Sequence, residues 1–197
     1  MYKLALAHFK KNDPVLHEAG IKIDTIMLSI HPEPFVRLCR SILGQQLSVK
    51  AAQTIFDRFE KLFEKGINPE DLLKNQNDNL RACGISYTKI SYLKDLAHKT
   101  LSEEIDLHGL KNFSNKEVIE TLVKVKGIGA WTAEMFLMFS LGRSDVFSYG
   151  DLGLRNAIQK LYKLKQKPTE KQMEKLTKKW SPYKTYASMI LWRSLTF

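Results

Sequence analysis

The sequence lacks several features that would point to particular classes of protein. Its two cysteines, Cys39 and Cys83, are too few for a disulfide framework and cannot by themselves hold a zinc ion or an iron–sulfur cluster. No apolar run approaches the roughly 20 residues of a membrane span, and the first residues do not form a signal peptide. Internal repeats, low-complexity tracts and long linkers are also missing. We therefore expect a globular protein with free, buried thiols and no membrane partner.

Acidic residues are in short supply relative to basic ones. The 197 residues include 31 Lys and Arg but 21 Asp and Glu, which gives a formal net charge of +10. This excess favours a polyanionic partner such as nucleic acid. Many lysine-rich proteins bind no nucleic acid, so charge alone leaves the two possibilities evenly balanced.

Strand-like alternation is scarce, whereas apolar residues recur at helical spacing along most of the chain. Ser48 and Ser86 precede two such segments as N-caps, and Asp13-Pro14 has the sequence of a helix start. The fold class is therefore all-α, with about ten helices and a loop at 108–112. The expected helices lie at residues 2–11, 14–19, 35–43, 49–64, 69–74, 77–83, 87–101, 115–126, 130–141, 151–164, 169–179 and 182–195.

A glycine pair, Gly127 and Gly129, separates two of these helices. Glycine lets the backbone turn tightly and approach a ligand closely, and the helix that follows presents free N–H groups and the positive end of its dipole. Such N–H groups bind phosphate, and Lys124, Lys126 and Thr132 are candidates to contact a phosphate group at this place. A plain corner between two helices also needs glycine, so the pattern alone leaves both interpretations open.

Asp151 follows this segment and starts the next expected helix. Aspartate is a favoured helix N-cap, and this role alone explains the residue. A carboxylate at such a position can also serve in catalysis, so the position alone leaves both roles open.

Six segments together resemble the HhH-GPD superfamily of DNA glycosylases, in particular the 3-methyladenine DNA glycosylase II group. They are residues 42–52 (ILGQQLSVKAA), 80–86 (LRACGIS), 125–133 (VKGIGAWTA), 145–147 (DVF), 150–155 (GDLGLR) and 180–187 (WSPYKTYA). The resemblance implies two helical lobes, a helix-hairpin-helix motif and a cleft between the lobes. One lobe would comprise residues 34–143 and the other residues 1–33 plus 144–197, with no N-terminal β-domain.

The resemblance also implies a function. The chain would flip an alkylated base, of the 3-methyladenine or 7-methylguanine type, out of duplex DNA and hydrolyse its N-glycosidic bond, with Asp151 as the catalytic residue. Bifunctional relatives carry a lysine two residues after the second glycine of the hairpin, where this chain has Trp131. We therefore expect a monofunctional enzyme that leaves an abasic site and has no lyase activity.

The resemblance assigns the remaining site residues. Trp131 and Trp192 would line the base pocket with Met135, Tyr149 and Tyr186, because an aromatic face attracts a cationic base. Met135 replaces a tyrosine of the best-known bacterial relative, which leaves the range of bases open. Gln45 and Gln46 are the candidates to fill the gap left by the flipped base. Trp180 is expected in the core.

A monovalent cation, sodium or potassium, would lie at the hairpin on the backbone carbonyls of Val123, Val125 and Ile128. No other cofactor and no iron–sulfur cluster is expected. The partner would be duplex DNA, the chain a monomer, and its location the cytoplasm and nucleoid of a prokaryote or the nucleus of a eukaryote. Two alternatives remain open: a glycosylase for uracil or an oxidised purine, and a non-catalytic DNA-binding module.

Overall fold

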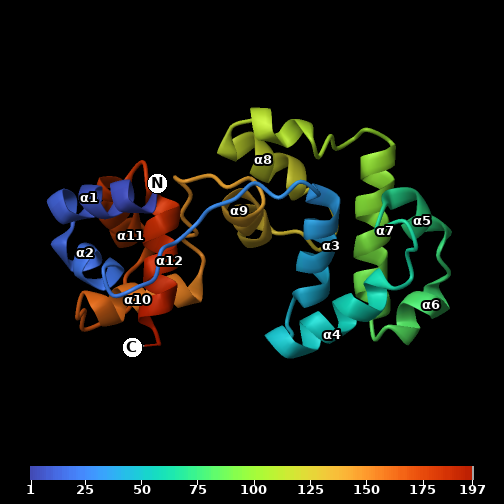
Figure 1. The fold of residues 1–197 in the computed structure, drawn as a ribbon, viewed down its shortest axis with the longest axis horizontal. Helices are drawn as coiled ribbons and strands as arrows, with labels where there is room; N and C mark the ends of the chain where they lie inside the picture. The colour runs from blue at the N-terminus through green and yellow to red at the C-terminus, as the bar shows by residue number, and fades with distance from the viewer. Residues whose placement is uncertain (197) are drawn as a thin grey trace. The chain divides into compact units, whose positions relative to one another are not determined.

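The computed structural model describes residues 1–196, and within them the fold is all-α, as predicted, with twelve α-helices and two 3-10 helices (Figure 1). The chain divides into two compact units, His31–Phe136 and Met1–Ile30 with Leu137–Phe197. The division falls inside one helix, α9 (Ala130–Phe139). None of the helices in residues 1–196 has both the length and the apolar content needed to cross a membrane.

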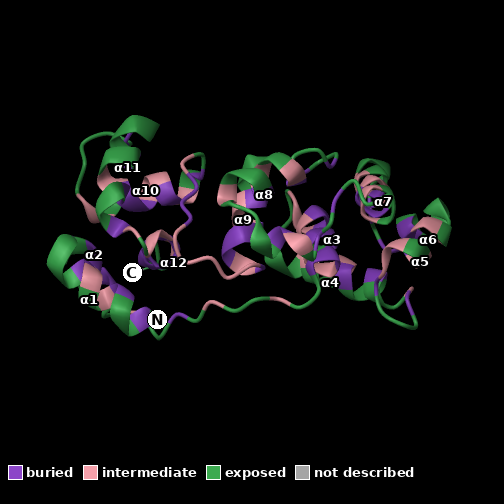
Figure 2. Cartoon of the chain, turned by 90° about the horizontal axis from the view of Figure 1, so that it is seen from above, coloured by how far each residue is buried: buried purple, intermediate pink, exposed green. Residues whose placement is uncertain are grey.

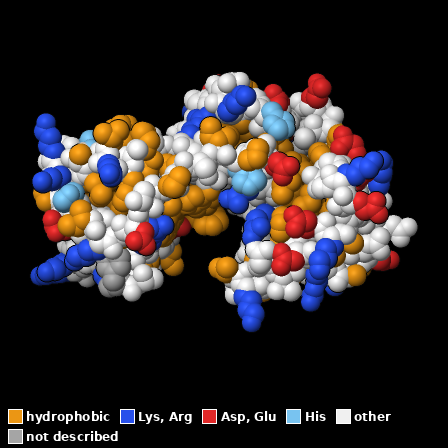
Figure 3. Space-filling model, viewed as in Figure 1, with side chains coloured by type: hydrophobic (Ala, Val, Ile, Leu, Met, Phe, Trp, Pro, Cys, Tyr) orange, Lys and Arg blue, Asp and Glu red, His pale blue; other side chains and the backbone are white. Residues whose placement is uncertain are grey.

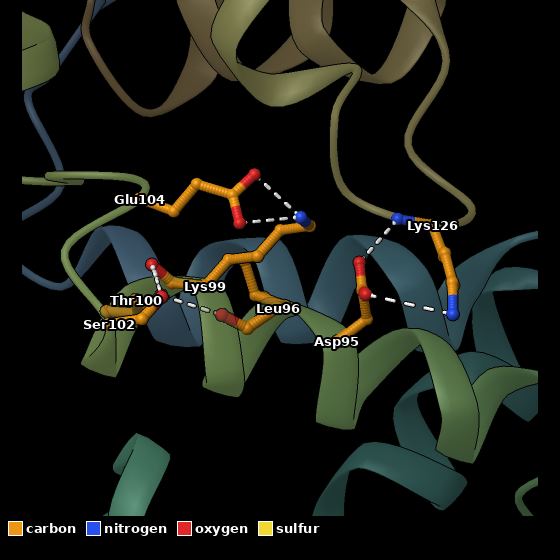
Figure 4. Close-up of polar contacts among 7 residues, drawn as sticks. All are labelled: Asp95, Leu96, Lys99, Thr100, Ser102, Glu104 and Lys126. Atoms are coloured by element: carbon orange, nitrogen blue, oxygen red, sulfur yellow. Dashed lines mark hydrogen bonds and ion pairs between the residues drawn. The ribbon is translucent and has the colours of Figure 1, made fainter.

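The continuous unit is built around α7 (Tyr87–Leu101), which packs against three other helices. These are α3 (Pro34–Gly44), α5 (Pro69–Lys74) and α6 (Asn77–Ala82), while α4 (Val49–Glu60) packs against α3. The unit continues with η1 (Gly109–Asn112) and α8 (Asn115–Leu122). After α7, an ion pair of 2.7 Å between Lys99 and Glu104 stabilises the turn (Figure 4).

The second unit is formed by both ends of the chain. Its helices are α1 (Tyr2–Asn12), α2 (Pro14–Gly20), α10 (Leu152–Leu161), α11 (Glu170–Thr177), η2 (Lys178–Trp180) and α12 (Lys184–Ser194). Helix α12 packs against α10 and α2, and α1 packs against α2. Buried residues lie along α10, whereas α11 is mostly exposed (Figure 2). Trp180 is fully buried in this core, as predicted.

Local side-chain caps explain where many helices begin. The side chains of Ser48 and Ser86 accept hydrogen bonds from the backbone N–H groups of Ala51 and Lys89, respectively. Ser114 forms a reciprocal capping box at the start of α8. These sequence-encoded starts agree with the predicted ones. Cys39 and Cys83 are buried and free, also as predicted.

Helix ends were predicted less well. The predicted helix at 49–64 ends at Glu60, and that at 115–126 ends at Leu122, because tight turns replace the last helical bonds. The predicted loop at 108–112 contains η1, whose first N–H groups are held by the side chain of Asp106. The last helix begins at Lys184 instead of residue 182.

Candidate functional site

The glycine pair lies in a compact turn between α8 and α9, residues 123–129, which we call the hairpin. The side chains of Val125 and Ile128 are buried beneath it, whereas Lys124, Lys126 and Gly129 are exposed. The backbone N–H of Ile128 donates to the carbonyl of Val125 at 3.1 Å. The turn therefore presents glycine backbone and two lysines to solvent over a small apolar base.

The two glycines have different physical roles. Gly127 has a φ of +79°, and a Cβ at this position would lie 2.1 Å from Cδ2 of Tyr92. Gly129 has no atom within 4 Å of the place where a Cβ would be. The fold itself therefore requires Gly127, whereas the space at Gly129 leaves the backbone open to an approaching ligand.

Helix α7 also holds the turn through Asp95. The Asp95 carboxylate accepts the backbone N–H of Lys126 at 2.8 Å, and the Lys126 ammonium lies 4.0 Å from its other oxygen (Figure 4). The Lys126 side chain is 71% exposed, so this surface ion pair is weak and leaves its charge accessible to an anion.

The loop between α3 and α4 carries the two glutamines. The Gln45 side chain donates from Nε2 to the carbonyl of Gly127 at 2.8 Å. Gln46 has a φ of +59°, a left-handed conformation that is costly for a residue other than glycine, and it is exposed. Gln45 thus belongs to the contact with the hairpin, whereas Gln46 lies at the tip of the loop.

A groove of about 630 Å³ lies between this loop and the start of α9. Trp131 lines it and is 48% exposed, whereas the side chain of Thr132 is buried. The Arg40 guanidinium lies 4.6 Å above the Phe56 ring and also lines the groove. The full lining is Arg40, Ser41, Gly44, Gln45, Gln46, Leu47, Gly127, Trp131 and Thr132.

Asp151 lies in the other unit, at the N-cap of α10. Its Oδ1 accepts the backbone N–H of Leu154 at 2.7 Å and the indole N–H of Trp192 at 3.0 Å. The residue is 9% exposed. Two donors at the start of the helix therefore fix the orientation of the carboxylate.

Trp192 is fixed by packing as well as by its hydrogen bond. Its ring lies 6.1 Å from that of Phe139. A Cβ at Gly153 would lie 3.0 Å from Oδ1 of Asp151 and 3.2 Å from the indole. The small residue at position 153 thus lets the indole reach the carboxylate.

The other three residues predicted to line the base pocket differ in their burial and contacts. Met135 is half-buried on α9. The Tyr149 hydroxyl lies 3.0 Å from Oγ1 of Thr177, and its ring packs on Phe147. Tyr186 is 2% exposed, and burial raises the pKa of its phenol. The structure therefore places Tyr186 in the core of its unit.

The carbonyls of Val123, Val125 and Ile128 remain the candidate cation ligands. The Val125 carbonyl already accepts one hydrogen bond, and a carbonyl oxygen has a second lone pair for a cation.

Sequence reasoning gave no role to several residues that organise the site. They are Lys89, Tyr92 and Asp95 on α7, Phe139 on α9 and Gly153 on α10. The three-residue spacing of Lys89, Tyr92 and Asp95 was a usable signal, since it puts polar side chains on one face of an expected helix.

Comparison with known proteins identifies the class. Residues 39–182 match the HhH-GPD superfamily of base excision DNA repair proteins. The chain belongs to this superfamily.

Within this superfamily, the chain is similar to the following individual proteins. The chain is 39% identical over 165 residues to DNA-3-methyladenine glycosylase 1 of Schizosaccharomyces pombe, covering 82% of this chain and 72% of the relative. It is similar to the crystal structure of a DNA-3-methyladenine glycosidase from Bacillus halodurans, with a TM-score of 0.86 and 37% identity over 96% of this chain and 88% of that chain. It is also similar to S. pombe Mag1 in complex with abasic DNA, with a TM-score of 0.84 and 34% identity over 98% and 97%.

Proposed function

We propose that this protein is a DNA glycosylase that removes alkylated bases, such as 3-methyladenine and 7-methylguanine, from duplex DNA. The observation that carries the proposal is the Asp151 carboxylate, held in one orientation by the N–H groups of Leu154 and Trp192. The named relatives, which are 3-methyladenine glycosylases, support the choice of substrate.

The reaction breaks the bond between the base and C1′ of the deoxyribose. The base leaves with the bonding electrons, and positive charge develops on the sugar. Asp151 stabilises this charge and orients the water molecule that attacks C1′, and the Asp151 carboxylate accepts the proton that the water loses. An alkylated base that is already cationic leaves as a neutral molecule, so the protein need not protonate it.

Recognition of the base rests on aromatic faces. Trp131 is 48% exposed and Trp192 is half-buried, so each offers part of its ring to a ligand. A tryptophan face attracts a cation by roughly 0.5–2 kcal/mol. Each ring by itself would therefore favour a cationic base over an uncharged normal one.

Base extrusion needs a side chain to occupy the vacated space. We assign this role to Gln46, because it lies at the exposed tip of its loop in a left-handed conformation. Gln45 instead keeps the loop against the hairpin through its bond to Gly127.

The hairpin would bind a phosphate of the DNA backbone. Gly129, the first turn of α9 and the ammonium groups of Lys124 and Lys126 would contact it, and a sodium or potassium ion on the hairpin carbonyls would add positive charge nearby. Lysine and arginine side chains are spread over the face of each unit drawn in Figure 3, in line with the net charge of +10 and with long-range attraction to DNA.

Trp131 stands where bifunctional relatives carry a lysine, so no amine at that position forms a Schiff base. The product would be an abasic site in an unbroken strand. We further propose that the protein acts as a monomer and without an iron–sulfur cluster. It would act where the DNA lies, in the nucleoid of a prokaryote or the nucleus of a eukaryote.

The two hairpin glycines should respond differently to substitution. Gly127→Ala is expected to destabilise the protein by about 2–4 kcal/mol, because alanine is strained at positive φ and its Cβ overlaps Tyr92. Gly129→Ala should fold normally but bind DNA about tenfold more weakly, because its methyl group blocks a charge-assisted contact. Urea unfolding and fluorescence anisotropy measure the two effects. Equal DNA affinity for Gly129→Ala and wild type would remove Gly129 from the phosphate site.

Product analysis tests the function as a whole. The purified protein is incubated with methylated duplex DNA, with uracil-containing DNA and with DNA containing an oxidised purine. We expect free 3-methyladenine from the first substrate, and strand breaks after alkali treatment but not before it. Release of uracil or the oxidised purine alone would replace the proposed substrate. DNA binding without release of any base would contradict the proposed activity.

A further inference from the structure

Lys89, on α7, donates two hydrogen bonds to the end of another helix. Its ammonium group lies 2.7 Å from the carbonyl oxygen of Leu43 and 2.8 Å from that of Gln45. The last carbonyls of an α-helix have no partner within the helix, and a cation there also complements the helix dipole. Lys89 therefore caps α3 from a distant part of the chain, at the point where the loop carrying Gln46 begins.

Gln45 is hydrogen-bonded both to Lys89 and to the hairpin. Its backbone carbonyl is held by Lys89, while its side-chain amide donates to the carbonyl of Gly127 at 2.8 Å. One residue thus joins α7, the loop that starts at the end of α3 and the hairpin.

Helix α7 holds the hairpin from the same side. The Tyr92 ring lies where a side chain at Gly127 would be, and Asp95 accepts the backbone N–H of Lys126 (Figure 4). Lys89, Tyr92 and Asp95 follow one another at three-residue steps and so share one face of α7. Both segments expected to touch DNA therefore rest on this face.

The loop needs such support because of the conformation at its tip. Gln46 has a φ of +59°, and a strained conformation persists only when its surroundings determine it. The carbonyls on the N-terminal side of this strained residue are the ones that Lys89 holds. Burial lowers the pKa of the Lys89 ammonium, in keeping with a side chain that is partly buried.

We propose that Lys89 is a positioning residue for base extrusion, which fixes the Gln46 loop at one distance from the hairpin. The proposal rests on the proposed function, since it concerns how the damaged base leaves the duplex. Lys89 acts through Gln46 and the loop and does not touch the reacting atoms. Its loss should therefore slow extrusion of a stacked, paired base more than hydrolysis of a base that is already unpaired.

Lys94 provides a matched control on the same helix. It donates from Nζ to the carbonyl of Asn75 at 3.2 Å, at the end of α5, and is also partly buried. Lys94→Met removes a lysine–carbonyl contact of the same kind from the same unit without touching the loop or the hairpin.

The experiment compares wild type, Lys89→Met, Lys89→Arg and Lys94→Met under single-turnover conditions. One substrate carries the methylated base paired in a duplex, and the other carries it in a single strand. We expect Lys89→Met to slow release from the duplex by about 10- to 100-fold and release from the single strand by less than about threefold. Lys89→Arg should recover most of the rate, and Lys94→Met should match wild type on both substrates.

A second readout does not depend on catalysis. A duplex with 2-aminopurine beside a tetrahydrofuran abasic site reports unstacking by an increase in fluorescence. Wild type and Lys94→Met should produce the increase, and Lys89→Met should lose most of it. If Lys89→Met folds poorly, Gln45→Leu, which breaks the bond to Gly127, should lower the same signal.

Two outcomes would overturn the proposal. Equal losses on the paired and the single-stranded substrate would make Lys89 a residue of general stability, and unchanged rates with unchanged fluorescence would deny it any role. If wild type releases no base but gives the fluorescence increase that Lys89→Met loses, the proposed function fails while the positioning role stands.

Discussion

Asp151→Asn is expected to lower the single-turnover rate of base release from methylated duplex DNA by at least about 100-fold, with little change in the unfolding temperature. Asparagine is as good an N-cap as aspartate, and its Oδ1 can still accept the N–H groups of Leu154 and Trp192. The substitution therefore removes the negative charge and keeps the local structure. Base release and thermal unfolding are measured on the same preparation.

Asp106→Asn is a suitable control for this experiment. Oδ1 of Asp106 also accepts two backbone N–H groups, those of His108 and Gly109, but at the start of η1 in the other unit. It should release bases at the wild-type rate. Full activity of Asp151→Asn would mean that the Asp151 carboxylate serves only to cap α10, and the proposed mechanism would be wrong.

The helix starts could be predicted because their determinants are local. Ser48, Ser86 and Asp13 each bind a backbone N–H three residues later, so a short stretch of sequence contains both partners. Helix ends depend on competing turns of similar energy, and the prediction at 115–126 was accordingly too long. The 3-10 helix at Gly109–Asn112 was missed because it depends on the side chain of Asp106 as well as on the residues within it.

The candidate site likewise contains residues that could be predicted from the local sequence and residues that could not. Gly127 and Asp151 could be identified because glycine at a turn and aspartate at a helix start have local signatures. The partners that orient them lie far away in sequence: Trp192 is 41 residues from Asp151, and Gln45 is 82 residues from Gly127. No periodicity in one chain reveals such pairs. Lys89 lies 46 residues from Leu43, so the spacing that places Lys89 beside Tyr92 on α7 does not identify its partner, which only the contact shows.

A buried carboxylate also organises the unit formed by the chain ends. Asp13 is 1% exposed, and its Oδ2 accepts the Tyr162 hydroxyl at 2.6 Å, the Trp180 indole N–H at 2.7 Å and the Lys179 ammonium at 3.0 Å. Its Oδ1 accepts the backbone N–H of Leu16 at 3.3 Å. Asp13 thus connects the start of α2 with the ends of α10 and η2.

Asp13→Asn is expected to destabilise the protein by roughly 2–4 kcal/mol in urea unfolding at pH 7. An amide offers one acceptor atom where the carboxylate offers two, so at least one buried donor loses its partner. Asp24→Asn, an exposed change of the same kind in the same unit, should stay within about 0.5 kcal/mol of wild type.

The destabilisation caused by Asp13→Asn should shrink in acid. Burial acts to raise the pKa of Asp13, but the hydrogen bonds from Tyr162, Trp180, Lys179 and Leu16 outweigh it, so the folded pKa lies below the ordinary value. In the unfolded chain, the Asp13 carboxylate binds a proton near its ordinary pKa of about 3.9. In the folded chain, it binds a proton only at a lower pH. The contribution of the charge to stability is therefore complete above about pH 5 and is lost as the pH falls through the folded pKa. Urea unfolding at pH 7, 5 and 3.5 measures the difference in free energy of unfolding between wild type and Asp13→Asn. A difference that grows in acid would contradict this account.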